Sequence, residues 1–384
     1  MDLDFTEEQR MIREMTRKFA EEEIVPSSRR NDITENFPRE IIDKMAQVGL
    51  LGGPVPKEYG GSDLDYISHA IVTEEIGRAD SSVRTTISVQ ISLVELTILK
   101  WGSEEQKKKY LPQLCNGRMI GCFGLTEPDA GSDAANQSTS ARNDGKEWII
   151  EGRKIWISNG DFADIAIIFA QTGKEKGYEG ITAFLVEKET PGYSTRRISG
   201  KLGLRASDTA ELILEGCRVL AGSMLGKEGE GFKIAMSALD NGRYSVAAGC
   251  VGIIQGCLDL SSRYARERMQ FGRPIGSFQL VQDMIARMGV DLEAARLLVY
   301  KAGHLKNKGL QSTLETSMAK YFASEAAVRA ATDAIQIFGA YGYSDENPVE
   351  RYYRDAKVAT IYEGTSQIQK LIIGSHILGI KAFT

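Results

Sequence analysis

Apolar side chains recur at helical spacing in two long stretches of the chain, and a block with two-residue alternation separates them. The first helical stretch covers residues 1–118 and opens with a capping box formed by Thr6 and Gln9. Pro26 predicts the end of this first helix, because proline cannot donate the backbone hydrogen bond of a helix interior. Further helices are predicted over residues 39–48, 66–100 and 104–114, the first of them opened by Pro38.

The alternating block predicts a β domain over residues 119–228. Its strand candidates are rich in isoleucine and aromatic residues and cover residues 148–150, 155–158, 165–169, 181–186 and 212–214. A block of this size is typical of a small barrel or sandwich. Helical spacing returns from Gly231 and predicts four or five long helices in a C-terminal domain, residues 229–384. Because helices and strands are segregated, the sequence indicates an α+β fold and not an alternating parallel sheet.

Composition and charge argue against several classes of function. The 384 residues are 42% apolar and carry a net charge of −5, whereas a general nucleic-acid-binding protein presents a basic face. Five cysteines without CxxC spacing and three scattered histidines argue against a metal site and against Ser-His-Asp catalysis. The acidic N-terminus argues against a signal peptide, and no apolar run approaches the ~20 residues of a membrane span. We therefore expect a cytoplasmic protein with reduced, mostly buried cysteines.

Glycine-rich segments do not indicate a common nucleotide-binding loop. Residues 225–232 are rich in glycine but lack the GxxxxGK[ST] pattern of a phosphate loop. The chain also has no GxGxxG motif in a strand-helix-strand context. A bound dinucleotide cofactor would therefore not be held in the Rossmann manner.

A lone carboxylate near the C-terminus is the first candidate for chemistry. Glu363 lies where a helical pattern breaks, and Gly364 after it permits backbone angles that other residues avoid. Uncharged hydrogen-bonding residues follow at Thr365, Ser366, Gln367 and Gln369. A carboxylate on such a break, with no basic neighbour in sequence, is suited to act as a general base on a bound substrate. The alternative is a glutamate in an ordinary loop.

Six segments together resemble the acyl-CoA dehydrogenases, in that family's order and spacing and over essentially the whole chain. They are Phe123–Asp133, Trp156–Asn159, Lys201–Ser207, Arg268–Gly272, Gln336–Gly339 and Ile361–Gln369. The resemblance is strongest to the short- and branched-chain branch. It implies an N-terminal helical domain, a middle β domain and a C-terminal four-helix domain, with FAD between them. It also implies a homotetramer built as a dimer of dimers, an acyl-CoA substrate, and electron-transferring flavoprotein as the electron acceptor.

The resemblance assigns a set of cofactor contacts. The positions that match the family's flavin-ring and phosphate contacts are Phe123, Leu125, Thr126, Gly131 and Ser132, and Ser132 also matches a CoA-phosphate contact. Trp156 and Ser158 match the pair that packs on and hydrogen-bonds the isoalloxazine, although Trp156 alone would be interpreted as a core aromatic. The adenine and pyrophosphate contacts, partly across a subunit boundary, correspond to Arg268, Phe271, Gln279, Gln336 and Gly339, and the set ends with Thr365 and Gln367.

The resemblance also points to Glu363 as the catalytic base. Asp240 and Arg243 match a segment that binds CoA and orders the catalytic arm. Relatives of the isovaleryl and long-chain type carry their catalytic glutamate immediately before this arginine, where this chain has Gly242. In the implied mechanism Glu363, with Gly364 beside it at the substrate, removes the α-proton while the β-hydrogen leaves as hydride to flavin N5. The Glu363 backbone N–H and a ribityl hydroxyl would bind the thioester carbonyl, and burial would raise the Glu363 pKa.

Arg84 bears on the choice of acyl group. It stands among apolar neighbours in a predicted helix, where a guanidinium is costly without an anionic partner. One interpretation is an internal salt bridge with Asp80 or Glu95. The other is that Arg84 receives a carboxylate at the far end of the acyl chain. Glutaryl-CoA and benzylsuccinyl-CoA dehydrogenases, which this stretch resembles, imply that role, with Thr85 and Ser158 as neighbouring contacts.

Gly77 bears on decarboxylation. Decarboxylating glutaryl-CoA enzymes carry a glutamate seven residues before the arginine, and this chain has Gly77 there. We interpret the glycine as widening the pocket, which favours 2-benzylsuccinyl-CoA over glutaryl-CoA. The alternative function is a short- or branched-chain monocarboxylic acyl-CoA dehydrogenase in which Arg84 is structural. Two rival classes share this fold. Slow reoxidation in air would exclude a flavin oxidase or monooxygenase, and flavin bleaching by an acyl-CoA would exclude a non-catalytic binding protein.

Overall fold

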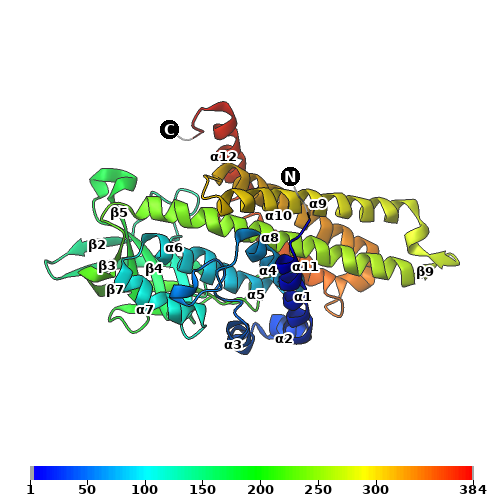
Figure 1. Cartoon of the computed structure of the whole chain (residues 1–384), viewed down its shortest axis with the longest axis horizontal. Helices are drawn as coiled ribbons and strands as arrows, with labels where there is room; N and C mark the ends of the chain where they lie inside the picture. Colours follow the sequence, from blue (N-terminus) through cyan, green and yellow to red (C-terminus); the bar gives the residue numbers. More distant parts are fainter. Residues whose placement is uncertain (1–3, 383–384) are drawn as a thin grey trace.

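Helix α8 (Gly231–Glu267) runs along much of the long axis of the molecule, and the other elements pack around it (Figure 1). The structure is a computed structural model that describes residues 4–382. One end of α8 reaches the sheet of the middle domain, and helices from both helical parts of the chain flank the rest of it. The chain thus has the predicted α+β architecture, with a sheet between two helical parts.

The N-terminal helix continues past Pro26. Helix α1 (Glu7–Phe19) starts at the predicted capping box, and both hydrogen bonds of that box are present. A π-helical turn, η1 (Ala20–Ile24), joins α1 directly to α2 (Val25–Thr34). The predicted end at Pro26 is wrong, because Pro26 lies in the first turn of α2, where proline is tolerated.

The single helix predicted over residues 66–100 is divided into four segments. They are α4 (Tyr66–Ala79), α5 (Ser81–Ser88), the π-helical η3 (Val89–Glu95) and α6 (Leu96–Trp101). The backbone of Asp80 is extended, and its carboxylate accepts the N–H groups of Ser82 and Val83. Asp80 therefore ends one helix and caps the next. The other N-terminal elements are α3 (Arg39–Gln47), which Pro38 precedes as predicted, η2 (Lys57–Tyr59) and α7 (Glu104–Cys115).

The middle domain is one sheet in the order β6-β7-β3-β2-β4-β5-β8, with β1 paired to β4. Its strands are β1 (Gly121–Gly124), β2 (Ser140–Asn143), β3 (Glu147–Ser158), β4 (Ile165–Gln171), β5 (Ile181–Glu187), β6 (Tyr193–Arg197), β7 (Thr209–Leu220) and β8 (Met224–Leu225), with the short helices η4 (Lys174–Gly180) and η5 (Ala221–Ser223). All predicted strands lie within these strands, and two of them form the single strand β3. The predicted barrel or sandwich takes the form of one mixed sheet whose edges are β6 and β8.

Strand β4 is buried on both faces of the sheet. Ile167 and Phe169 belong to a core shared with η3 and the start of α8, whereas Ile168 belongs to the sheet's second core with Trp148 and Leu212. Burial on both faces explains why this strand reads as a continuous apolar run and not as an alternating one. The sheet is thereby fixed against the helices that carry the candidate site.

Residues 229–382 contain five α-helices, where four or five were predicted. After α8 the elements are β9 (Met269–Gln270), β10 (Arg273–Pro274), η6 (Ile275–Ser277), α9 (Gln279–Asn307), α10 (Thr313–Phe338), η7 (Gly339–Tyr343), α11 (Val349–Ala359) and α12 (Ser366–Leu378). Within residues 4–382, α8 alone is long and apolar enough to cross a bilayer, but 72% of its most apolar window is buried in the protein. All five cysteines are buried and free of disulfides, as predicted. Residues 4–382 contain no cluster of three potential metal ligands.

Candidate active site

A strained turn presents the candidate base. The Glu363 turn (residues 360–365) joins α11 to α12, and both Glu363 and Gly364 have left-handed backbones, with φ of 53° and 88°. A non-glycine residue held in this region costs on the order of 1–3 kcal/mol, so its surroundings must fix it. Arg243 Nε donates to the Glu363 carbonyl at 3.2 Å, and the Gln369 amide donates to the carbonyls of Glu363 and Gly364 at 3.1 and 3.0 Å. Residues of α8 and α12 thus hold the turn from two sides.

The Glu363 carboxylate is free to accept a proton. The residue as a whole is partly exposed, but its Oε2 is enclosed and has no hydrogen-bond partner. Burial raises the pKa of Glu363 to about 7, against the opposing charges of Lys320, Arg243 and Arg84. A carboxyl group with a pKa near neutrality combines ionisation with basicity, which is the property required of a general base at that pH.

Gly242 leaves the space that the Glu363 carboxylate occupies. A Cβ on Gly242 would collide with Glu363 Oε2. Gly242 lies in α8 directly before Arg243, at the position where the resemblance places the alternative glutamate. The two possible base positions therefore face the same point in space, and in this chain the carboxylate reaches it from the Glu363 turn.

Arg84 lies in α5 and is 2% exposed. Its Nη2 donates to the Tyr362 hydroxyl at 2.8 Å, whereas Nε and Nη1 are buried without a partner. The internal salt bridge with Asp80 or Glu95 is not formed, because Asp80 caps α5 and burial raises the pKa of Glu95 well above its usual value. Two guanidinium nitrogens of Arg84 are thus buried without a hydrogen-bond partner close to the Glu363 turn.

Glycines on facing helices make room for Arg84. A Cβ on Gly249 of α8 would lie 2.6 Å from both Cδ and Nε of Arg84. Gly77 of α4 packs on Gly249, and a Cβ on Gly77 would lie 2.8 Å from the Gly249 carbonyl oxygen. The interpretation that Gly77 widens the acyl pocket is wrong, because the α8 backbone fills the place of the missing side chain.

Two strand ends of the middle domain meet beside α5. The Ile155 N–H of β3 donates to the Thr126 carbonyl, which follows β1, at 2.9 Å. The Asn159 amide, directly after β3, donates to the carbonyls of Thr86 in α5 and Gly121 in β1, both at 3.2 Å. These bonds bring the end of β3 to the helix that carries Arg84. These elements and the segment directly after β1 carry the predicted residues Phe123, Leu125, Thr126, Trp156, Ser158, Arg84 and Thr85.

The surface at these strand ends fits a large planar group. Trp156 has a left-handed backbone, with φ of 62°, and is 59% exposed, so it is not the core aromatic that its residue type suggests. An indole held in this way offers a flat apolar platform. Gly131 and Ser132 are exposed, and no atom lies within 4 Å of where a Gly131 Cβ would stand, so an anionic group can approach the backbone closely. These residues fit a flavin ring and a phosphate.

Asp240 and Arg243, the predicted CoA contacts, form an ion pair within α8 at 3.0 Å. The Arg243 side chain is 6% exposed and bonds the Glu363 carbonyl, so it supports the turn from inside. Asp240 is 25% exposed and also accepts the Thr313 hydroxyl at 2.7 Å. Asp240 is therefore the member of the pair that a ligand can reach.

The predicted adenine and pyrophosphate contacts lie at the opposite end of α8. Arg268 lies over the ring of Tyr341, 5.5 Å from its centroid, which places the end of α8 beside η7. Figure 1 shows β9, next to Arg268, at the end of the molecule remote from the sheet. The predicted residues here, all exposed, are Arg268, Phe271, Gln279, Gln336 and Gly339. One copy of the chain therefore does not bring them to Trp156 and Ser158.

Two predicted cofactor contacts lie at the start of α12. The Thr365 hydroxyl accepts the Ile368 N–H at 3.3 Å and so caps this helix, and Gln367 is exposed. Sequence reasoning missed Tyr362, Asn159 and Lys320, and the Lys320 ammonium donates to the Gly364 carbonyl at 2.7 Å. Asn159 and Tyr362 lie within segments that carry the resemblance but were given no role, and Lys320 stands as a lone charge within an alanine-rich helical face.

Comparison with known proteins identifies the family. The N-terminal, middle and C-terminal domains of acyl-CoA dehydrogenase match residues 6–118, 122–217 and 229–378. An acyl-CoA dehydrogenase of Bacillus subtilis is 48% identical, with 97% of this chain and 99% of the relative covered. A short-chain-specific acyl-CoA dehydrogenase of Clostridium acetobutylicum is 46% identical (98% and 100% covered). A glutaryl-CoA dehydrogenase of Desulfococcus multivorans is 44% identical (99% of each covered).

Solved structures agree with this result. A chain from work on the electron transferring flavoprotein of Acidaminococcus fermentans has a TM-score of 0.97 at 46% identity, covering 98% of this chain and 100% of that one. A glutaryl-coenzyme A dehydrogenase in complex with glutaryl-CoA has a TM-score of 0.96 at 43% identity (99% and 98% covered). A glutaryl-CoA dehydrogenase of Mycobacterium smegmatis with FADH2 has a TM-score of 0.95 at 34% identity (99% and 97% covered). The chain therefore belongs to the acyl-CoA dehydrogenases, the FAD-dependent oxidoreductases that act on CH–CH bonds.

Proposed function

We propose that this chain dehydrogenates acyl-CoA thioesters between the α and β carbons, and that its acyl group carries a carboxylate at the far end. The observation that carries this proposal is Arg84, which is buried, bonded to Tyr362 and left with two unpartnered guanidinium nitrogens. A planar guanidinium without an acidic partner suits a carboxylate, which can accept two of its N–H groups. Tyr362 directly precedes Glu363, so the carboxylate end of the substrate would bind close to the residues that perform the chemistry.

Glu363 is the general base in this proposal. Its unpartnered Oε2 can accept the α-proton, and the burial that raises its pKa to about 7 then favours the neutral product form. Arg243 and Gln369 hold the carbonyls of the turn, so the carboxyl group is fixed while it takes the proton. FAD, when bound, supplies the acceptor for the β-hydrogen as hydride. Trp156, Ser158, Leu125 and Thr126 would hold its ring, and Gly131 and Ser132 an anionic part.

A homotetramer, built as a dimer of dimers, would complete the cofactor site. Arg268 and Phe271 flank β9, which lies at the end of the molecule remote from the sheet (Figure 1), and Phe271 is 92% exposed. A second copy would have to bring such residues to the first copy's FAD. We therefore assign the adenine and pyrophosphate contacts to a neighbouring subunit.

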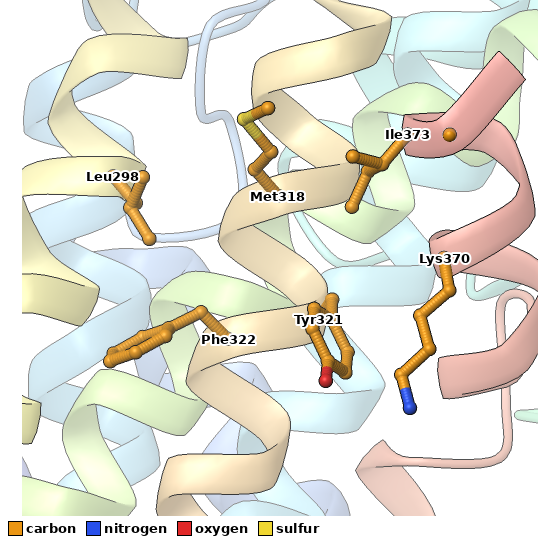
Figure 2. Close-up of a pocket in the computed structure, with 7 residues that line it drawn as sticks. Leu298, Met318, Tyr321, Phe322, Lys370 and Ile373 are labelled. Atoms are coloured by element: carbon orange, nitrogen blue, oxygen red, sulfur yellow. The ribbon is translucent and has the colours of Figure 1, made fainter. Parts of the chain in front are cut away.

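An apolar groove between α9, α10 and α12 supports this assembly. Figure 2 shows its lining side chains, among them Leu298, Phe322 and Ile373. Large apolar side chains close to these positions in α9 and α12 are also exposed, namely Leu297, Ile377 and Leu378. An exposed apolar groove with further exposed apolar side chains beside it is typical of an interface, and we propose a second copy of the chain as its partner.

We further propose electron-transferring flavoprotein as the electron acceptor and the cytoplasm as the location. The similarity to a chain studied with the electron transferring flavoprotein of Acidaminococcus fermentans supports the first assignment. Five buried cysteines without a disulfide fit a reducing compartment, which supports the second.

Glutaryl-CoA and 2-benzylsuccinyl-CoA are the candidate substrates. Similarity to glutaryl-CoA dehydrogenases supports the first, and the packing of Gly77 removes the wide-pocket argument that favoured the second. Dehydrogenation of monocarboxylic acyl-CoAs is the second candidate function, because the Arg84–Tyr362 hydrogen bond would also suit a structural arginine. The similarity to a short-chain-specific enzyme agrees with that alternative.

Flavin bleaching by a panel of acyl-CoAs tests the proposal. The panel contains butyryl-, glutaryl- and 2-benzylsuccinyl-CoA, each mixed with FAD-loaded protein without oxygen and then exposed to air. We expect a dicarboxylyl-CoA to reduce the flavin fastest, and Arg84→Met to remove that preference. The loss of one charge-assisted pair in a closed pocket costs about 2–5 kcal/mol, or roughly 30- to several-thousand-fold in kcat/KM.

Arg296→Met provides the matched control. Arg296 is a largely buried arginine of α9 whose charge is satisfied by Glu74 at 2.6 Å, so its loss should affect stability and not substrate preference. Preference of the wild type for butyryl-CoA would show that Arg84 is structural. Rapid reoxidation in air would indicate an oxidase, and absence of bleaching by any member would contradict dehydrogenation of these substrates.

A further inference from the structure

Lys320 is a buried cation that faces the Glu363 turn from α10. Its side chain lies among the buried alanines Ala319, Ala323 and Ala327 on that helix. Its ammonium donates to the Gly364 carbonyl at 2.7 Å. Within residues 4–382 no carboxylate lies within ion-pair distance of it, in contrast to the buried Lys154, whose ammonium is 2.7 Å from Glu127. A single carbonyl acceptor offsets only part of the free-energy cost of burying an ammonium group.

The charges around Lys320 show what else it acts upon. Burial lowers the pKa of Lys320 to about 8. Cys250, Glu363 and Glu325 oppose this decrease, whereas the positive charge of Arg243 adds to it. Lys320 is thus still largely protonated at pH 7. Of the three cations that stabilise ionised Glu363, Lys320 has the largest effect, ahead of Arg243 and Arg84. The ammonium and the base therefore influence each other although no hydrogen bond joins them.

The Gly364 carbonyl is the point at which this charge can control the geometry of the turn. Arg243 and Gln369 reach the Glu363 carbonyl, and Lys320 and Gln369 reach the carbonyl of Gly364. Of the two donors to the Gly364 carbonyl, Lys320 is charged and Gln369 is neutral. Because Glu363 has a left-handed backbone, loss of one of these donors would let the turn relax toward ordinary angles and displace the carboxylate.

We propose that Lys320 is a positioning residue for the base: its ammonium fixes the Gly364 carbonyl and places a positive charge beside the Glu363 turn. This inference rests on the proposed role of Glu363 as the base. It extends that function, because a residue of α10 that takes no part in the reaction would help to set the position of the base and the pH range in which the base is ionised. A neutral donor of similar length would preserve the carbonyl contact but not the charge.

The test compares Lys320→Met with Lys320→Gln in the FAD-loaded enzyme. The rate of flavin reduction is measured from pH 5.5 to 9 with butyryl- or glutaryl-CoA, whichever reduces the wild type faster. Loss of the charge should move the acid limb of the profile upward by about one pH unit, a tenfold change in ionisation. The methionine variant should also lose rate at its pH optimum, because it lacks the donor, whereas the glutamine variant should retain more of it.

Two further variants separate this inference from the proposed function. Lys357→Met removes an exposed lysine of α11 and should reproduce the wild-type profile. Glu363→Gln should abolish flavin reduction, and if it does not, the proposed base is wrong whatever Lys320 does. If Glu363→Gln is inactive and both Lys320 variants keep the wild-type acid limb, Lys320 has only a structural role. Where the methionine variant fails to fold, the acid limb of the glutamine variant decides the question.

Discussion

The absence of a single Cβ determines where the base can stand. Gly242 opens the space that Glu363 Oε2 occupies, and Arg243, the next residue, holds the Glu363 carbonyl. Adjacent residues of α8 thus perform separate tasks, one by leaving room and the other by donating a hydrogen bond. The strained φ of Glu363 and its pKa of about 7 both follow from the way this turn is enclosed.

Gly242→Ala should therefore inactivate the enzyme without unfolding it. The methyl group would displace the end of a side chain and not backbone, so the fold and FAD content should persist. Displacement of a catalytic group by about 1 Å costs about 100-fold in rate, and we expect a loss of that order in flavin reduction. Gly289→Ala is the control, since no atom lies within 4 Å of its Cβ position in α9. Wild-type rates in the Gly242 variant would contradict the geometry of this site.

At the scale of elements, interruptions of the helices place the residues proposed to contact the substrate. Helix α5 starts anew at the Asp80 cap, which directs Arg84 toward α8 and Tyr362. The π-helical η3 that follows turns the Gln90 side chain toward β1, where its carbonyl oxygen accepts the Gly121 N–H at 2.8 Å. π-Helical turns often occur at functional sites because they re-aim side chains.

These interruptions are the part of the fold that the sequence did not predict. Periodicity predicted the helices, the main strands and their segregation, because apolar spacing records which face is buried. It did not predict the break at Asp80, because an apolar pattern continues through it and only the capping geometry reveals the change. The candidate base and Arg84 were found from the family resemblance and from the cost of burying a charge. Lys320 and Tyr362 were missed because their partners lie 44 and 278 residues away in the chain.

Gly249→Ala tests whether the α5–α8 contact controls specificity. The new Cβ would lie 2.6 Å from Cδ and Nε of Arg84, so the guanidinium would have to move while the helix backbones stay in place. We expect kcat/KM for glutaryl-CoA to fall by about tenfold or more, as a misaligned charge pair loses part of its binding energy. Butyryl-CoA, which has no carboxylate, serves as the control within the same variant. An equal loss for both thioesters would mean that the site is distorted generally.

At the scale of the whole molecule, buried polar contacts join the three parts of the chain around the site. Asn159 links the sheet to α5, and Arg354 of α11 forms an ion pair with Asp32 of α2 at 2.6 Å. Asp355, beside Arg354, accepts the Leu204 N–H at 2.6 Å and so joins the C-terminal part to the segment between β6 and β7. Burial raises the pKa of Asp355 to about 7, although the Leu204 hydrogen bond opposes that change.

The Asp355 contact should make the stability of the whole enzyme depend on pH. The native state keeps this proton up to about pH 7, whereas the unfolded chain loses it near 3.8. The contribution of Asp355 to the free energy of unfolding is therefore complete below the pKa of the unfolded chain and is lost as pH rises through 7. Between pH 5 and pH 8 this contribution decreases by about 2–3 kcal/mol. Asp355→Asn keeps an oxygen that can accept the Leu204 N–H but has no proton to lose, so its unfolding midpoint should fall less over this range. Thermal unfolding of both proteins at pH 5, 6, 7 and 8 measures the difference. Parallel curves would show that Asp355 is ionised in the native state across this range, whereas a stability advantage of the variant that grows from pH 5 to pH 8 identifies this contact as a proton-dependent joint between the domains.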